Sequence, residues 1–200
     1  MTRLPSRLAR LQNGCVIVGR PDPRFRWLIA IAALLLIAAC APRGQLAFSD
    51  ARSGTPHDIL LATSRNAIAG TPDFGTGRAA EMSFARYTVS VPPAHQVGQI
   101  EWPGARPDAD KDFVTTGYQG LADARAFANA VSARAGALPQ GRREAVIFVH
   151  GYNTNLAEGL YRFAQINHDF EARSIPILYS WPSAASPRDY LYDRDSILFA

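Results

Sequence analysis

An apolar run, Val-Ile-Phe-Val at residues 146–149, leads directly into His150 and Gly151 and constrains the fold more than any other feature of this sequence. A short run without polar residues is typical of a parallel strand covered on both faces. Gly151 permits a sharp turn and lets a ligand approach the backbone closely. We therefore expect a buried parallel strand over residues 145–149 that ends in a functional loop.

Helical and strand patterns alternate around this run. Apolar residues recur at helical spacing over 120–135, and Asn155 with Glu158 forms the capping-box pattern that opens a helix reaching about residue 170. Residues 175–180 form another apolar strand, which Pro182 ends, and a helical pattern begins at residue 190. Helices and strands in alternation predict an α/β fold with a parallel sheet.

The preceding residues predict an added β-hairpin. Residues 58–65 have the composition of a first strand, and the glycines and proline of 67–78 indicate a loop. Apolar and polar residues alternate over 84–91, the period of a half-buried antiparallel strand. Residues 97–102 are a second short strand candidate, so the hairpin is expected from 84–91 and 97–102.

The first 39 residues have the pattern of an export signal. Arg24 and Arg26 precede an apolar run from Trp27, and small residues stand directly before Cys40. A cysteine there resembles the cleavage and lipidation site of a bacterial lipoprotein, which predicts a cell-envelope protein held to the membrane through lipidated Cys40. A cleaved signal without a lipid, giving a soluble secreted or periplasmic protein, is the alternative. The apolar run of 27–39 is shorter than the roughly 20 residues that a membrane-spanning helix needs.

Charge and cysteine content exclude several classes of function. Six of the 21 basic and one of the 17 acidic residues precede Cys40, which leaves 15 and 16 after it, a net charge of −1. No basic patch remains to predict a nucleic-acid partner. Cys15 and Cys40 both lie in the leader, so the domain has no disulfide framework or thiolate metal site. The acidic residues at 108, 110 and 112 lack the glycine and the closing glutamate of a calcium loop, so we predict no metal and no cofactor.

Five segments, in order, resemble a bacterial family of α/β hydrolases. They are Leu-Leu-Ala-Thr-Ser-Arg at 60–65, Val-Ser-Val-Pro-Pro-Ala-His at 89–95, Phe-Val-His-Gly-Tyr-Asn at 148–153, Tyr-Ser-Trp-Pro-Ser at 179–183 and Tyr-Asp-Arg-Asp-Ser at 192–196. The family is largely uncharacterised and is often described as esterase- or lipase-like lipoproteins. The resemblance covers about residues 58–200. It implies that residues 58–200 are the N-terminal part of an α/β-hydrolase sheet, incomplete at the C-terminus. Before this domain, the sequence predicts the leader over 1–39 and, from a composition rich in Gly, Ser, Pro and Arg, a flexible tether over 40–57.

The resemblance also implies a site. The loop of His150, Gly151 and Tyr152 would form part of an oxyanion hole, with the backbone N–H of Tyr152 as donor and His150 shaping the turn. The rim of a pocket for a small acyl ester would follow the two apolar strands, at Asn153, Ser180, Trp181 and Ser183. From the residues alone, the same segments also fit a structural turn and a packed aromatic beside proline.

The nucleophile expected of such an enzyme is missing from the 200 residues. No two glycines stand four positions apart, so there is no Gly-x-Ser-x-Gly. His57, His95 and His168 precede any nucleophile and do not fit the chain order of the triad, and Ser196 fits a helix surface better than a nucleophile. The sequence therefore leaves three interpretations open: a truncated, inactive copy of a serine esterase, a non-catalytic envelope lipoprotein or binding module, or a chain completed by another polypeptide. The oligomeric state is not predicted.

Overall fold

The computed structural model describes residues 43–199, with the backbone alone for Phe199. Its elements are, in order, β1 (Thr55–Ala67), β2 (Phe74–Val91), β3 (Val114–Leu121), α2 (Ala124–Ala137), β4 (Ala145–Val149), α3 (Leu156–Asp169), β5 (Ile175–Ser180), α4 (Tyr190–Ser196) and a 3-10 turn (Ile197–Phe199). The strands form one sheet in the order β3-β2-β1-β5-β4. The β1–β5 and β5–β4 pairs are parallel, and the β1–β2 and β2–β3 pairs are antiparallel. The α/β fold class predicted from the sequence is confirmed.

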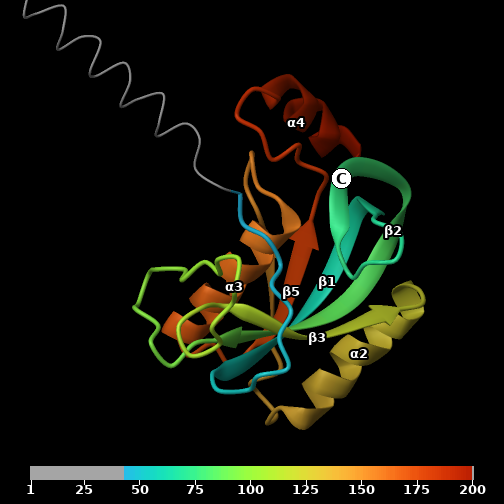
Figure 1. Cartoon of the computed structure of the whole chain (residues 1–200). Coiled ribbons are helices and arrows are strands. Elements are labelled where there is room, and N and C mark those ends of the chain that lie inside the picture. Colours follow the sequence, from blue (N-terminus) through green and yellow to red (C-terminus); the bar gives the residue numbers. More distant parts are fainter. Residues whose placement is uncertain (1–42, 200) are drawn as a thin grey trace, which may run out of the picture. The chain divides into compact units, whose positions relative to one another are not determined.

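The two long helices cover opposite faces of this sheet (Figure 1). Successive residues of β1 point to opposite faces, so Ile59 and Leu61 pack against the α3 side while Leu60 packs against the α2 side. The larger core lies under α3 and includes Tyr87, Leu160 and Phe163, all but fully buried. A helix with nine buried residues, as α3 has, is held mainly by this packing.

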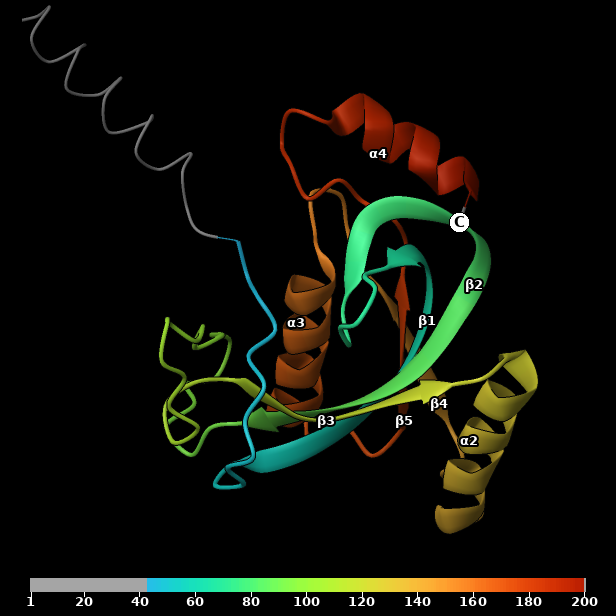
Figure 2. The ribbon, with the colours of Figure 1, turned by 45° about the vertical axis from the view of Figure 1, so that its right-hand side comes forward.

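β1 and β2 form a long, bent hairpin (Figure 2). Its turn contains Gly70 at φ 75° and Pro72. The register of β1 shifts on both sides of Arg65, which pairs with Arg78 between two irregularities. Bulges of this kind bend a strand and redirect a side chain, and here the redirected side chain is the buried Arg65.

The structure differs from the sequence prediction in the N-terminal half. Residues 97–102 form no strand; they lie in a loop in which Glu101 accepts hydrogen bonds from His95 and from the backbone N–H of Gln96. The hairpin expected from 84–91 and 97–102 is therefore wrong, because β2 pairs with β1 and β3 instead. Gly75 and Gly77 belong to β2 rather than to a loop. A Cβ at either position would come within 3 Å of Asn66 Oδ1, so glycine fits there.

The strands after residue 140 were predicted with correct bounds, but the environment of β4 was not. Val146, Ile147 and Val149 are 46%, 63% and 54% exposed, whereas the apolar run predicted burial on both faces. β4 pairs with β5 along one edge, and no described strand pairs with the other. β4 is thus an exposed edge strand of the described sheet.

Residues 43–49, within the predicted tether of 40–57, are held against the domain. The backbone N–H of Ala47 donates to Tyr161 Oη at 3.0 Å, and Ser49 N–H donates to the carbonyl of Thr115 at 3.0 Å. The predicted leader and Cys40 lie outside the described residues. In the part of the chain from residue 43 on, no helix is both long enough and apolar enough to span a membrane.

Candidate functional site

The loops that follow β4 and β5 meet at the carboxyl end of the parallel strands, where open α/β sheets place their ligands. The loop of residues 150–155, here called the His150 loop, connects β4 to α3. The segment 181–189 connects β5 to α4. Each loop is held by side chains that are distant in sequence.

Arg65 is the centre of a buried polar cluster beneath the His150 loop. Its side chain is fully buried, and burial lowers its pKa to about 10, so it remains charged near neutral pH. A guanidinium has five N–H donors, and here all five have acceptors within 3.3 Å. The acceptors are Ser180 Oγ, the carbonyls of Gly75, Ser183 and Thr154, and His150 Nε2. The arginine therefore joins β2, the His150 loop and the segment after β5.

His150 serves as a neutral acceptor in this cluster. Its Nε2 receives hydrogen bonds from Arg65 and from Ser180 Oγ at 3.0 Å, which leaves Nδ1 to donate to the carbonyl of Gly151 at 2.9 Å. Burial, together with the nearby Arg65, lowers its pKa to about 4. The ring stacks on Trp181, whose Nε1 donates to the carbonyl of His150 at 2.8 Å. His150 is thus fixed in orientation and proton state.

Asp193, on α4, fixes the other side of the loop. It is 1% exposed, and its carboxylate accepts from the N–H of Asn153 at 2.9 Å, from Ser183 Oγ at 2.6 Å and from the N–H of Ala184 at 2.6 Å. Asn153 has φ 55°, a left-handed conformation that asparagine tolerates better than most residues. Its N–H is occupied by Asp193 and cannot serve as an oxyanion donor.

The Gly151–Tyr152 segment differs from its neighbours because its backbone N–H groups donate to no residue between 43 and 199. Tyr152 Oη is bonded to the carbonyl of Pro187 at 2.7 Å, so the side chain is anchored while the amide stays available. A Cβ added to Gly151 would meet no atom within 4 Å. The space in front of this peptide is therefore open, as a ligand-binding peptide requires.

Two cavities flank the same peptide. One, of about 360 Å³, is walled mainly by apolar and aromatic side chains, namely Val149, Tyr152, Tyr179, Trp181, Tyr190 and Ile197, with Asp193 and Arg194 at its side. The other, of about 320 Å³, lies against Trp102, Phe148, Glu158 and Arg162. His150 and Gly151 line both. Volumes of this size are at the lower end of the range for small-molecule sites.

Comparison with known families gives a match to the C-terminal part of the chain. Residues 129–200 match the family model described as alpha/beta hydrolase of unknown function (DUF900). No curated protein and no solved structure matches the chain. The segment 129–200 is thus similar to α/β hydrolases of that family. It includes β4, the His150 loop, β5 and α4, and so contains most of the geometry described above.

The site residues predicted from the sequence lie at two depths in the structure. Gly151 and Tyr152 are exposed in the loop, and Trp181 lines the apolar cavity. Ser180 and Ser183 are fully buried and lie in the Arg65 cluster beneath the cavity, and His150 is 4% exposed. Arg65 and Asp193 belong to the family-like segments, but the sequence pattern predicts no role for either. An arginine at the end of an otherwise apolar strand is the signal that could have identified Arg65.

The remaining histidines lie away from this candidate site. His95 is held between Glu101 and Asp169, each at 2.8 Å, and these hydrogen bonds raise its pKa in spite of burial. His57 Nε2 lies 3.2 Å from His168 Nδ1, near the C-terminal end of α3. Within residues 43–199, no group of side chains has the arrangement of a metal site.

Proposed function

We propose that this chain carries the oxyanion-stabilising half of a serine-type acyl hydrolase that acts on a small carboxylic ester. The observation that carries the proposal is the unpartnered Tyr152 N–H, in a loop fixed on both sides and next to an apolar cavity. Preorganised N–H donors of this kind stabilise the negative charge that develops on an acyl oxygen. The hydrolase family of residues 129–200 supports the same chemistry.

The chemical roles follow from the geometry. The ester carbonyl oxygen would accept from Tyr152 N–H, with its acyl chain in the cavity of Trp181 and Tyr190. His150 is no general base here, because its Nε2 already accepts two hydrogen bonds and its pKa is lowered to about 4. The attacking serine is not provided by a Gly-x-Ser-x-Gly among the 200 residues. We therefore expect the chain alone to hydrolyse p-nitrophenyl butyrate no faster than buffer.

Ligand binding tests the oxyanion role without requiring turnover. Hexanoate and 1-hexanol share a chain and differ in the head group, so an oxyanion site should prefer the carboxylate. An apolar binding pocket, the function of a non-catalytic binding module, should prefer the alcohol, because a carboxylate is costlier to desolvate. We expect hexanoate to bind more tightly and to shift the amide NMR signal of Tyr152. Tighter binding of hexanol with no Tyr152 shift would favour the binding module.

Gly151→Ala gives a sharper test of the same site. The added methyl meets no atom within 4 Å, so the stability should change little, but it would stand where the ligand approaches the peptide. We expect hexanoate affinity to fall about tenfold, a steric cost on the order of 1–2 kcal/mol. Gly104→Ala, also in open space but outside the His150 loop, is the control.

We further propose that Cys40 is lipidated and that the protein is anchored in the cell envelope of a bacterium. The support is the sequence pattern of Arg24, Arg26, the apolar run and the small residues before Cys40. Expression in a Gram-negative host should yield a membrane-fraction protein that begins at Cys40 and has the mass of added acyl chains. Cys40→Ser should abolish that mass. Unmodified soluble protein that retains residues 1–39 would refute the anchor, and a cleaved chain without lipid would support the secreted alternative.

A further inference from the structure

The segment Arg43–Ser49 is here called the strap. Its first residue contacts the His150 loop, and its later residues lie against α3 and β3. Thr115 N–H donates to the carbonyl of Ala47 at 2.7 Å, and Tyr161 Oη receives the N–H of Ala47. These bonds fix the strap on the edge of the domain and bring its first residues to the start of α3. The strap therefore reaches the loop as an ordered segment.

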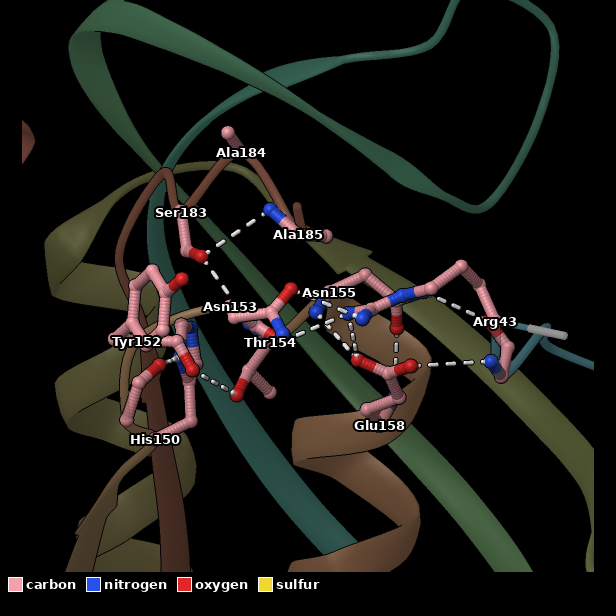
Figure 3. Close-up of polar contacts among 12 residues, drawn as sticks. Arg43, His150, Tyr152, Asn153, Thr154, Asn155, Glu158, Ser183, Ala184 and Ala185 are labelled. Carbon is pink, nitrogen blue, oxygen red and sulfur yellow. Dashed lines mark hydrogen bonds and ion pairs between the residues drawn. The ribbon is translucent and has the colours of Figure 1, made fainter. Parts of the chain in front are cut away.

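Arg43 binds the loop directly (Figure 3). Its Nη1 donates to Asn153 Oδ1 at 3.0 Å, and its Nη2 donates to the Asn153 carbonyl at 2.8 Å. Nη2 also pairs with Glu158 Oε2 at 2.5 Å. Asn153, to which Arg43 donates, follows Tyr152 in the chain. The N–H of Asn153 donates to the Asp193 carboxylate. Asn153 is thus fixed from both sides.

Gly44 joins the strap to the cap of α3. Its N–H donates to Glu158 Oε1 at 3.1 Å, and its carbonyl accepts from Asn155 Nδ2 at 2.8 Å. Asn155 and Glu158 form the capping box that begins the helix. A Cβ at Gly44 would lie 2.4 Å from the ring of Trp102 and 2.9 Å from Glu158 Cγ, so only glycine fits.

We propose that Arg43 and Gly44 are positioning residues for the oxyanion peptide. The strap determines where the Tyr152 N–H lies, and a loosened strap leaves the fold intact but the donor misplaced. The Arg43–Glu158 pair is partly exposed, with 38% and 21% of the two side chains accessible, and pairs of this kind add little stability. The effect on ligand binding should therefore exceed the effect on stability. The inference rests on the proposed oxyanion function.

The test compares Arg43→Gln with Arg52→Gln in the full chain. Arg52 is an exposed arginine of the next segment and makes no hydrogen bond or ion pair with the loop among the described residues, so it is the matched control. We expect Arg43→Gln to weaken hexanoate binding about fivefold or more and to reduce the Tyr152 amide shift, with the urea midpoint unchanged. Arg43→Lys keeps the charge but cannot bridge Asn153 and Glu158 together, so it should restore only part of the affinity.

A second variant, Gly44→Ala, tests the same strap from its other residue. Gly44→Ala should weaken hexanoate binding as Arg43→Gln does, whereas Gly104→Ala should leave hexanoate binding unchanged. Wild-type affinity and wild-type Tyr152 shifts in both strap variants would overturn the inference.

Hydrogen exchange separates this inference from the proposed function. The N–H groups of Asn153 and Thr154 are hydrogen-bonded to Asp193 and Ser183, so their protection can be measured without a ligand. We expect Arg43→Gln to accelerate exchange at these two amides and not in β1 or β5. If the wild type does not bind hexanoate, the oxyanion role fails. The exchange rates of the two amides still show whether the strap positions the loop. Unchanged protection of these two amides in Arg43→Gln would overturn the proposed positioning role of the strap in either case.

Discussion

At the scale of the residue, Arg65 shows how a buried charge can hold a loop. Its five donors are satisfied by five acceptors, and three of these are backbone carbonyls of three segments that are separate in sequence. A buried charge that is fully hydrogen-bonded is tolerated, but removing it leaves its partners unpaired in an apolar environment. We therefore expect the conformation of the His150 loop to depend on Arg65.

Arg65→Leu tests this dependence. We expect the free energy of unfolding to fall by about 3–5 kcal/mol, because the carbonyls and Ser180 lose a charged donor without gaining water. Urea denaturation measures the change. Arg86→Leu, an exposed arginine on β2, should stay within about 0.5 kcal/mol of wild type. Equal losses in the two variants would contradict the role assigned to Arg65.

His150 gives a pH dependence with a definite sign. Its pKa is lowered to about 4 in the folded chain, against about 6.5 when unfolded, so the unfolded state binds the extra proton between these values. The stabilisation is fully present above about pH 6.5 and is lost as the pH falls towards 4, amounting to about 3 kcal/mol. An NMR titration of the His150 ring should show no protonation between about pH 5.5 and 8. A midpoint near the ordinary value would refute the neutral, buried assignment.

At the scale of the element, the short α4 binds both the His150 loop and the segment after β5. Its Asp193 reaches the His150 loop and the segment after β5, although the helix has only seven residues. Asp193→Asn places an amide against three donors, one of which must lose its acceptor. We expect a loss of about 1–3 kcal/mol of stability and a shift of the Asn153 amide signal. Asp195→Asn, on the exposed side of the same helix, should change neither.

The comparison of prediction with structure is also clearest for elements. β4, β5 and the cap of α3 could be predicted because apolar runs and the Asn155–Glu158 pair are local patterns. β3 was missed because Thr115, Thr116 and Gly117 have little strand character of their own, and pairing with β2 makes them a strand. The predicted helix began at Gly120, but Leu121 pairs with Phe84, and the helix starts only after the N-cap Asp123.

The candidate site was predictable to a similar extent. The family pattern predicted a site at the loop of His150, Gly151 and Tyr152, and this role stays a prediction; the pattern did not indicate the residues that hold the loop. Arg65, Asp193 and Arg43 are distant in sequence from the loop, and only the folded chain shows that they meet there. Sequence patterns of short range do not contain contacts of this kind.

At the scale of the whole molecule, the exposed edge of β4 should govern solution behaviour. Val146, Ile147 and Val149 lie along an edge with free backbone groups in the described sheet, a combination that favours pairing with another chain. We expect the chain to self-associate with rising concentration, as measured by size-exclusion chromatography with light scattering. Ile147→Lys should reduce this association, whereas Val97→Lys, at an exposed apolar loop residue, should not. A monomeric wild type at every concentration would contradict the prediction.

The way in which the His150 loop is held also constrains the order of events during synthesis. The loop accepts hydrogen bonds from Arg43, near the beginning of the described chain, and donates one to Asp193, near its end. A chain emerging from the ribosome can form the β1–β2 hairpin early, because its strands are adjacent in sequence. The loop can reach its final conformation only after residue 193 has been translated. Until then the N–H of Asn153 has no acceptor on α4, so we expect the His150 loop to become ordered later than the β1–β2 hairpin.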